Sequence, residues 1–247
     1  MFDLHFYTKF QNMITDESRY IKRKLFCLTL IILLVFHFNG LYGQQTHEHE
    51  HIQSDISLYE RQEAQNQVRM YWQMPNRVLD EIGVESGQII ADVGCGIGYF
   101  TMRLAKKVSN SGMVYASDID TGALAFLKEK AVRQNIRNLK IIQGKEDDPL
   151  LPGSAIDMVL IVNTIHLIDR PSEYLSNLKS CLKPDGKVVI VQWDAEKMDS
   201  EAPDWSAEDR KKYTQQTTLR IIYDADYDVE RILDFLPVQL IYICCPR

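Results

Sequence analysis

From residue 76 onward, short apolar runs alternate with amphipathic stretches, and turn-forming residues separate them. Short apolar runs bounded by glycine, proline or polar residues are typical of buried strands. The run Ile156–Val162 is nearly all apolar, which indicates a strand covered on both faces, as parallel strands are. Strands are expected at 88–93, 113–118, 139–143, 155–163, 187–193, 226–234 and 238–244. Their alternation with helices predicts a doubly wound α/β sheet with helices on both faces.

The helices predicted around these strands have recognisable starts and stops. An amphipathic helix is expected over 56–74, where Pro75 stops it, and a short helix follows that ends at Gly83. Further helices are expected from near residue 99, from near residue 121, over 171–182 and over 203–223. The sequence shows no internal repeat, so residues 56–247 are predicted to form one α/β domain.

The segment before this domain has a different composition. Residues 22–24 are Lys-Arg-Lys, residues 25–38 are apolar, and small residues stand among 39–43. A basic flank, a short apolar core and a small-residue exit are typical of a signal peptide. The apolar run is shorter than the roughly 20 residues that a membrane-spanning helix needs. We therefore expect residues 1–43 to direct export, to the periplasm or outside the cell. The alternatives are an uncleaved membrane anchor and a buried apolar helix.

The net charge and the spacing of possible metal ligands limit what this protein is expected to bind. Residues 44–55 contain His47, His49 and His51 in alternation with glutamates, which could share a metal ion, but a solvated polar linker is the simpler interpretation. The five cysteines show no metal-ligand spacing, so no metal site is predicted. A net charge of −6 over 247 residues disfavours nucleic acid as a partner, because phosphates are neutralised by clusters of Lys and Arg.

The most informative segment is the loop after the first predicted strand. Gly94, Gly96 and Gly98 alternate along it, and Asp92 stands before them. Glycine allows a sharp turn and a close approach of the backbone to a ligand. The following helix directs its free N–H groups into the same crevice, at the carboxyl end of a strand. This arrangement predicts a site for a nucleotide-type ligand.

The glycine spacing narrows the ligand further. The dinucleotide fingerprint places its third glycine one residue later, which disfavours a nicotinamide-dependent oxidoreductase. The D-x-G-x-G-x-G pattern of residues 92–98 closely resembles the first motif of class I S-adenosylmethionine-dependent methyltransferases. The resemblance runs from about Tyr71 to the C-terminus. It implies S-adenosylmethionine as the cofactor, and its expected contacts include Asp92, Gly94, Cys95, Gly96, Gly98 and Asn163. It also implies a Rossmann-like seven-stranded sheet, mostly parallel with an antiparallel last strand.

An acid about 20 residues after the glycines supports the same ligand. The predicted strand 113–118 ends in Asp118, and Ile119 and Asp120 follow. In nucleotide-binding α/β folds, an acid at such a strand end accepts hydrogen bonds from ribose hydroxyls. We expect Asp118 to hold the ribose, with Ile119 beside the cofactor, and Asp120 to cap the next helix. The alternative is that either aspartate only caps that helix.

The resemblance also implies an acid beside the adenine, directly after the strand 139–143. Lys145 stands where the family usually has this acid, so the contact is expected to pass to Glu146 or Asp147. The alternative interpretation is a surface turn, rich in acids, that Pro149 closes.

The acceptor is expected near the end of the central strand. This strand ends at Asn163, on the edge of the implied substrate pocket, and His166 follows. A catalytic base is needed only if the acceptor loses a proton, and His166 is the best-placed candidate. The alternative is a histidine that hydrogen-bonds a loop backbone. The resemblance further implies that the helix 56–74 is a lid, with Trp72 near the acceptor or packed on the core.

These features predict direct in-line methyl transfer from a sulfonium to a small-molecule acceptor. Residues 163–166 do not form the Asn/Asp-Pro-Pro-Tyr signature of exocyclic amino-group methylation, and no Pro-Cys pair stands where cytosine methylation needs a nucleophile. The accepting atom and the oligomeric state stay open, and a membrane is a partner only through the N-terminal segment. A different class of function is an exported sensor or pseudo-enzyme that binds the cofactor without turnover.

Overall fold

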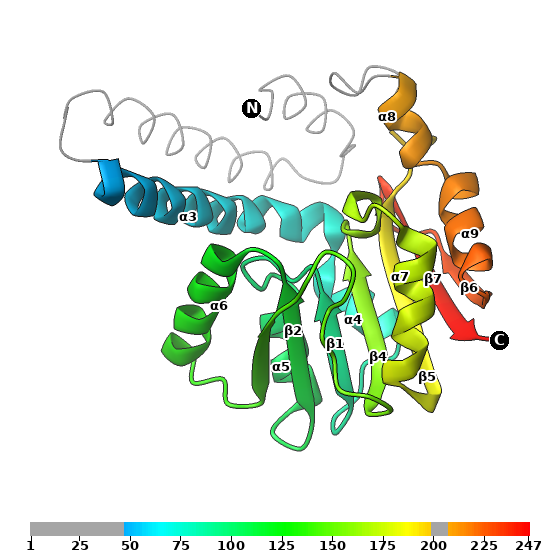
Figure 1. Cartoon of the computed structure of the whole chain (residues 1–247), viewed down its shortest axis with the longest axis horizontal. Coiled ribbons are helices and arrows are strands. Elements are labelled where there is room, and N and C mark those ends of the chain that lie inside the picture. Colours follow the sequence, from blue (N-terminus) through cyan, green and yellow to red (C-terminus); the bar gives the residue numbers. More distant parts are fainter. Residues whose placement is uncertain (1–46, 199–206) are drawn as a thin grey trace, which may run out of the picture. The chain divides into compact units, whose positions relative to one another are not determined.

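The computed structural model describes residues 47–198 and 207–247, with side chains over 58–198 and from 210 onward (Figure 1). Residues 54–200 and 205–247 form one compact unit, and the description below concerns that unit. The expected signal peptide, residues 1–43, lies outside the described residues. Within the described part of the chain, no helix combines the length and the apolar character needed to cross a membrane.

Seven strands form a single mixed sheet, as the resemblance implied. The strand order is β3-β2-β1-β4-β5-β7-β6, and only β7 runs antiparallel to its neighbours. The strands are β1 Ile89–Val93, β2 Met113–Asp118, β3 Leu139–Gln143, β4 Ile156–Val162, β5 Leu182–Trp193, β6 Tyr227–Leu233 and β7 Gln239–Pro246. The predicted fold class is therefore confirmed.

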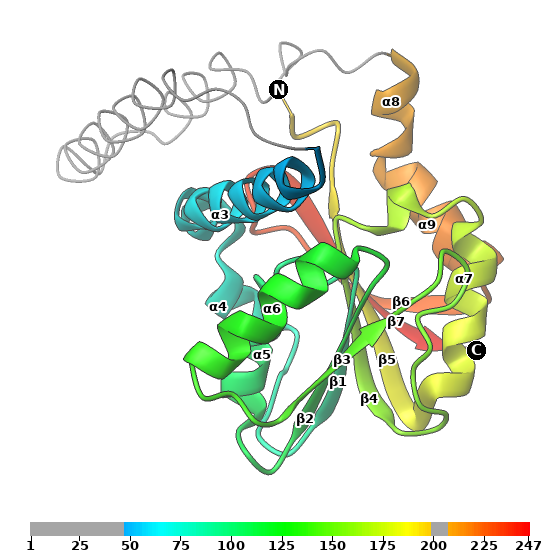
Figure 2. The ribbon, with the colours of Figure 1, turned by 60° about the vertical axis from the view of Figure 1, so that its left-hand side comes forward.

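Helices cover both faces of this sheet (Figure 2). They are α3 His47–Gln73, α4 Pro75–Glu81, α5 Thr101–Val108, α6 Thr121–Arg133, α7 Pro171–Leu178, α8 Ala207–Lys212 and α9 Gln215–Asp224, with short 3₁₀ turns η1 Ile165–Leu167 and η2 Lys179–Cys181. Side chains of α4 and α5 share one core with Ile90 of β1. Side chains of α7 and α9 share the other core with Ala91, the next residue of the strand. Because successive residues of β1 face opposite layers, both must be apolar.

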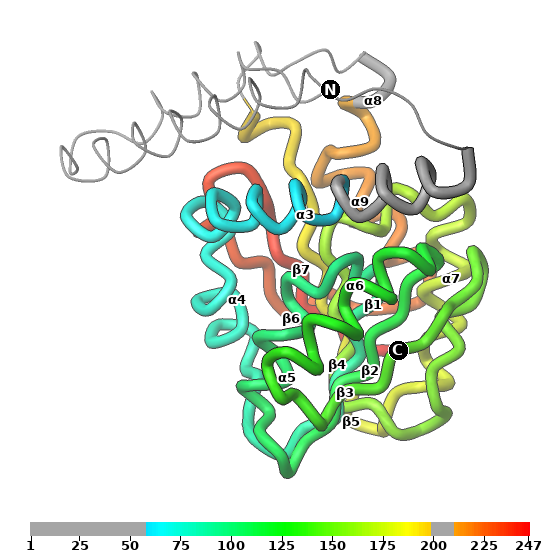
Figure 3. The backbone as a smooth tube through the Cα atoms, turned by 90° about the vertical axis from the view of Figure 1, so that its left-hand side faces the viewer, coloured from blue at the N-terminus to red at the C-terminus, as the bar shows by residue number. Residues whose placement is uncertain are grey.

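From residue 54 onward, helix α3 runs across the edge of the sheet where the parallel strands end (Figures 1 and 3). It begins at His47, nine residues before the expected start at Ile56, and so includes much of the segment expected to be a linker. No proline or glycine interrupts residues 47–73, so nothing in this stretch ends the helix. Met74, with φ 44°, and Pro75 end it at the predicted place.

Two other boundaries differ from the sequence-based expectation. The single helix expected over 203–223 is two helices, α8 and α9, because Thr214 accepts a hydrogen bond from the N–H of Thr217 and starts a new helix. The helix expected over 171–182 ends at Leu178. Strand β5 begins at Leu182, five residues before the strand expected over 187–193, and its pairing register with β4 shifts between Ile156 and Met158.

Candidate functional site

The glycine loop lies between β1 and α5 and contains two kinds of glycine. All three have positive φ: 72° at Gly94, 50° at Gly96 and 81° at Gly98. A Cβ at Gly94 would meet Thr164 at 2.1 Å, and one at Gly98 would meet Leu127 at 2.3 Å, so these two allow close packing. A Cβ at Gly96 would meet no atom within 4 Å. The backbone of Gly96 therefore faces open space, where a ligand can approach it.

Asp118 fixes the open side of this loop. It is the last residue of β2, and its Oδ2 accepts the N–H of Gly96 at 2.7 Å while its Oδ1 accepts the N–H of Asp120 at 3.0 Å. Ile119 beside it is 58% exposed. A carboxylate next to an uncovered backbone turn is the arrangement that binds a ribose in nucleotide-binding folds.

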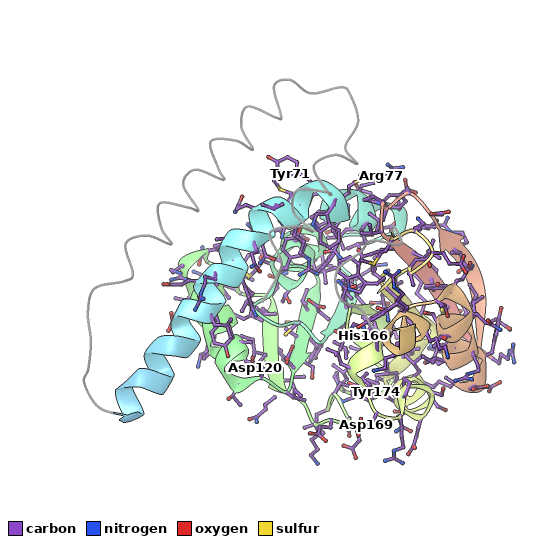
Figure 4. The ribbon with its side chains drawn as sticks, turned by 90° about the horizontal axis from the view of Figure 1, so that it is seen from above. Tyr71, Arg77, Asp120, His166, Asp169 and Tyr174 are labelled. Atoms are coloured by element: carbon purple, nitrogen blue, oxygen red, sulfur yellow. The ribbon has the colours of Figure 1, made fainter. Side chains whose placement is uncertain are left out.

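Asp120 has the capping role that the sequence predicted. Its Oδ1 accepts the N–H groups of Gly122 and Ala123 at 2.9 and 3.0 Å, so it caps α6. The hydroxyl of Tyr59 on α3 donates to the same carboxylate at 2.9 Å. Figure 4 shows Asp120 at the edge of the sheet that α3 crosses. Asp120 therefore connects α3 to the nucleotide-binding half of the fold.

Asp92 lies beneath the loop and carries an unusual carboxyl group. It is buried and accepts a hydrogen bond from the Thr101 hydroxyl at 2.6 Å. Burial raises the pKa of Asp92 to about 6, although the Thr101 hydrogen bond and the nearby Arg69 guanidinium oppose that rise. A buried carboxyl group with a raised pKa lowers the stability of the fold. Such groups are therefore found most often at functional sites.

Sequence analysis missed two residues above this acid, Arg69 and Tyr99. The Arg69 guanidinium on α3 lies 4.3 Å from the centre of the Tyr99 ring, and burial lowers the pKa of Arg69 to about 10. Tyr99 is 4% exposed, and its hydroxyl is the one buried side-chain polar atom in the described residues that lacks a hydrogen-bond partner. A buried hydroxyl without a partner, on a ring that a partly buried guanidinium covers, indicates a place for an anionic ligand group.

The position of Arg69 follows from the polar face that α3 turns toward the sheet. Tyr59, Glu63, Asn66 and Gln73 lie on this face with Arg69, at helical spacing. Glu63 pairs with Lys130 of α6 at 2.7 Å, and Gln73 donates to Gln239 at 2.9 Å. The spacing of polar residues along 59–73 could have revealed this face, but an amphipathic helix is ordinarily searched for an apolar one.

Amides and aromatic rings surround the strand ends near which the acceptor is expected. Gln239 donates to the Asn163 Oδ1 atom at 2.6 Å, which continues the chain of amides from Gln73 to the end of β4. Trp72 of α3 stacks on Trp193, the last residue of β5, with ring centroids 5.1 Å apart. Asn163 is therefore at the strand end where it was expected, and Trp72 packs on the acceptor side.

His166 lies in η1, directly after β4, and is partly buried. Its Nδ1 is 3.2 Å from the Gln192 Oε1 atom, and its ring meets the Tyr213 ring edge-on at 4.8 Å. Burial lowers the pKa of His166, as does the positive charge of Lys212, while the Gln192 hydrogen bond opposes the change. The hydrogen-bond partner of His166 is therefore the side chain of Gln192, and not the loop backbone that the alternative interpretation expected. Figure 4 shows His166 near α8, on the acceptor side.

Three other predicted contacts have a plainer environment. Glu146 and Asp147 are exposed on a turn in which the N–H of Lys145 donates to the Asp148 carbonyl at 2.7 Å. Their contact with adenine stays a prediction. Cys95 is 7% exposed, and burial raises the pKa of its thiol, which disfavours the nucleophilic thiolate.

Comparison with known proteins agrees with this geometry. The family model described as "Methyltransferase domain" matches residues 84–232, which is more than half of the chain. The chain belongs to this methyltransferase family. Its glycine loop, Asp118 and central strand β4 all lie inside the matched region.

Individual relatives support the same assignment. A SAM-dependent methyltransferase of Aquifex aeolicus is similar in structure, with a TM-score of 0.62, 26% identity, and coverage of 69% of this chain and 88% of that one. A demethylmenaquinone methyltransferase of Geobacillus sp. (strain WCH70) is 26% identical over 134 residues, 54% of this chain and 57% of that protein. An uncharacterized methyltransferase of Bacillus subtilis is 28% identical over 62% of this chain and 76% of its own length. The chain spans about half the length of most curated relatives that it matches.

S-adenosylmethionine is the cofactor that this family and fold indicate. A geranyl diphosphate methyltransferase solved in complex with SAM has the same fold, with a TM-score of 0.58, 13% identity, and coverage of 72% of this chain and 86% of that one. The residues present here fit such a cofactor. Gly96 leaves room for it, Asp118 offers a carboxylate, and the Tyr99 hydroxyl is buried without a partner.

Proposed function

We propose that this protein catalyses S-adenosylmethionine-dependent methyl transfer to a small-molecule acceptor at the carboxyl edge of its sheet. The observation that supports this most strongly is the backbone of Gly96, which faces open space beside a carboxylate that already holds the loop. When bound, S-adenosylmethionine supplies a methyl group on a positively charged sulfur. The acceptor's electron pair bonds to the methyl carbon, and the broken carbon–sulfur bond leaves its pair on sulfur.

We assign places to the parts of the cofactor from the surroundings of the described residues. Asp118 accepts hydrogen bonds from the ribose, and the exposed Ile119 covers one face of the adenine, with Glu146 or Asp147 at its edge. Arg69 and the Tyr99 hydroxyl receive the carboxylate of the methionine moiety, since that group is the anionic end of the ligand. A charge-assisted bond there is stronger than a neutral one.

The acceptor lies toward the ends of β4 and β5, where Asn163 and His166 border it. Several relatives are named for methyl transfer to menaquinone or ubiquinone precursors. We infer that this chain also acts on a small organic acceptor, and that His166 serves as its base.

Calorimetric titration tests the proposal in two stages. S-adenosylmethionine and S-adenosylhomocysteine should both bind to the full chain with one site per protomer. A dehydrogenase-type ligand such as NAD should not. Turnover with labelled methyl groups then separates an enzyme from the sensor or pseudo-enzyme alternative, which would bind both ligands tightly and transfer nothing.

We also propose that residues 1–43 direct export and are then removed. The basic flank and short apolar run of this segment support the proposal. N-terminal sequencing of the protein from its native host should give a mature chain that starts near Gln44. A chain in the cytoplasm that still carries residues 1–43 would contradict export and leave the methyltransferase proposal intact.

A further inference from the structure

The side-chain amide of Gln192 has a fixed orientation. Gln192 is 1% exposed at the end of β5, and its Oε1 lies 3.2 Å from the backbone nitrogen of Trp193. A backbone N–H can only donate, so the Gln192 atom that faces it must be the carbonyl oxygen. The reversed amide would set two donors against each other in a buried place, which is costly.

This orientation decides which His166 nitrogen carries the proton. The same Gln192 Oε1 atom lies 3.2 Å from His166 Nδ1. Because Oε1 can only accept, Nδ1 must be the protonated nitrogen of the neutral ring. The Nε2 atom then has a lone pair and no hydrogen. His166 lies in η1, just after β4, the strand whose end is proposed to border the acceptor, so this lone pair belongs to a residue on the proposed acceptor side.

We propose that Gln192 is a positioning residue that holds His166 as the Nδ1–H tautomer, so that Nε2 takes the hydroxyl proton of a phenol or enol acceptor. This inference rests on the proposed methyltransferase function and specifies its acceptor. The proton leaves the hydroxyl and bonds to Nε2, and the electron pair of the O–H bond stays on the acceptor. The resulting imidazolium returns the proton to solvent after the acceptor has been methylated.

The acceptor class follows from the strength of the base. A general base is efficient when its pKa and that of the acid it deprotonates are not far apart. The groups that the structure places around the ring are Gln192 on β5, Lys212 at the end of α8 and Tyr213 just after it. Burial and the Lys212 charge both disfavour a second proton on the ring. An imidazole, whose ordinary pKa is about 6.5, is already a weak base, and these surroundings lower the pKa of His166. Such a base suits a weakly acidic phenol or enol and does not suit an aliphatic alcohol.

Nitrogen-15 NMR of the histidine-labelled full chain tests the tautomer without any substrate. The chain has six histidines, and the His166→Gln variant identifies the signals of residue 166. In the unsubstituted protein, Nδ1 should resonate as a protonated nitrogen and Nε2 as an unprotonated one. Gln192→Met keeps the side-chain length but removes the acceptor, and should give a mixture of both tautomers. Gln134→Met makes the same change on the exposed end of α6 and should leave His166 unaltered.

A second variant keeps the test decisive if Gln192→Met does not fold. Gln192→Glu retains an acceptor for both N–H groups, so it should retain the Nδ1–H tautomer while the added negative charge raises the imidazole pKa. An Nε2–H tautomer in the unsubstituted protein would overturn the proposal. So would a tautomer that is unchanged in Gln192→Met.

The acceptor class is tested with labelled S-adenosylmethionine against a panel of phenols and hydroquinones and a matched panel of amines and thiols. Methylation within the first panel is expected, with kcat about tenfold lower or more in Gln192→Met and an unchanged KM for the cofactor. Methylation of amines or thiols alone would overturn this inference but not the proposed function. Failure to bind S-adenosylmethionine would overturn the proposed function, whatever the tautomer.

Discussion

The two halves of the sheet edge are built in different ways. On the cofactor half, the turn between β1 and α5 presents its backbone, and Asp118 at the end of β2 holds that turn by accepting the Gly96 N–H. On the acceptor half, side chains from distant segments meet: Gln73 of α3 reaches Gln239 of β7, and Gln239 reaches Asn163 after β4. The cofactor half is a backbone turn formed by residues close together in the sequence. The acceptor half is a network of side chains from distant segments.

This difference explains what each half can specify. A backbone turn with a fixed glycine spacing suits S-adenosylmethionine, because this cofactor is the same in every methyltransferase that uses it. A network of amides and aromatic rings can be rebuilt by single substitutions without altering the fold, so it can be adapted to different acceptors. We therefore expect substitutions in the cofactor half to affect cofactor binding strongly, and those in the acceptor half to affect turnover and selectivity.

The sharpest test of the cofactor half is Gly96→Val. The added side chain occupies the open space beside the loop and strains a residue with φ 50°. We expect affinity for S-adenosylmethionine to fall at least about a thousandfold, or about 4 kcal/mol, by calorimetry. Gly83→Val is the matched control, because Gly83 also has positive φ and its Cβ would meet only the Lys187 Nζ atom at 3.8 Å. If both variants bind the cofactor like the parent, the ligand site is elsewhere.

Asp92→Asn separates the stability of the cofactor half from its function. Burial raises the pKa of Asp92 to about 6 from 3.8, so the folded protein binds this proton more tightly than the unfolded chain does. The favourable contribution of protonated Asp92 to the free energy of unfolding is present below pH 3.8 and is lost as the pH rises through 6. At pH 7, the ionised Asp92 lowers the free energy of unfolding by at most about 3 kcal/mol.

The asparagine variant cannot titrate, and its side chain can still accept the Thr101 hydrogen bond. In urea unfolding at a series of pH values, we expect it to gain stability relative to the parent as the pH rises from 4 to 7. Its binding of S-adenosylmethionine should weaken at the same time. A stability difference that does not change with pH would show that Asp92 is not perturbed.

Substitutions of Asp118, which ends β2, and of Asp120, two residues later, should affect different properties of the protein. Asp118→Ala removes the carboxylate from the open side of the loop and should weaken S-adenosylmethionine about tenfold. Asp120→Ala removes the α6 cap and the Tyr59 contact. It should lower the unfolding free energy by about 1 kcal/mol and change affinity much less. Calorimetry and thermal unfolding of both variants provide the comparison, and equal losses of affinity would remove the distinction between them.

The same contrast explains what the sequence could predict. The β1–α5 turn was predictable because only glycine tolerates the φ values of Gly94 and Gly98 against Thr164 and Leu127, so the geometry leaves a mark on the sequence. The partnership between His166 and Gln192 joins residues 26 positions apart on different elements. A contact between residues on different elements has no characteristic spacing in the sequence. A histidine or a glutamine by itself also does not indicate such a contact.

Helix α3 shows the same limit. Its polar contacts with α6 and β7 depend on where the helix lies across the sheet, which the sequence of the helix does not encode. It is also better connected than the few tethers expected of a free lid. However, a polar interface exposes little apolar surface when it separates, so local opening should still cost less than unfolding a central strand such as β4.

Tyr59→Phe gives the smallest expected effect and tests this interface directly. The substitution keeps the ring, which packs against Ala123 and Phe126, and removes only the hydrogen bond to Asp120. Loss of one such bond costs about 1 kcal/mol, so the amides over 59–73 should exchange about fivefold faster with deuterium. Tyr71→Phe is the matched control on the same helix, because Tyr71 is 51% exposed and points outward (Figure 4).

Bound S-adenosylmethionine should slow exchange of the α3 amides in the parent, since Arg69 and its neighbours then gain a ligand, while β4 stays protected throughout. Tyr59→Phe should keep most of that protection, because the cofactor contacts lie nearer the other end of the helix. If the α3 amides of the ligand-free parent already exchange as slowly as those of β4, then α3 is a fixed part of the core. In that case the contrast between the two halves would lie in their side chains alone, and Trp72 would be a packing residue.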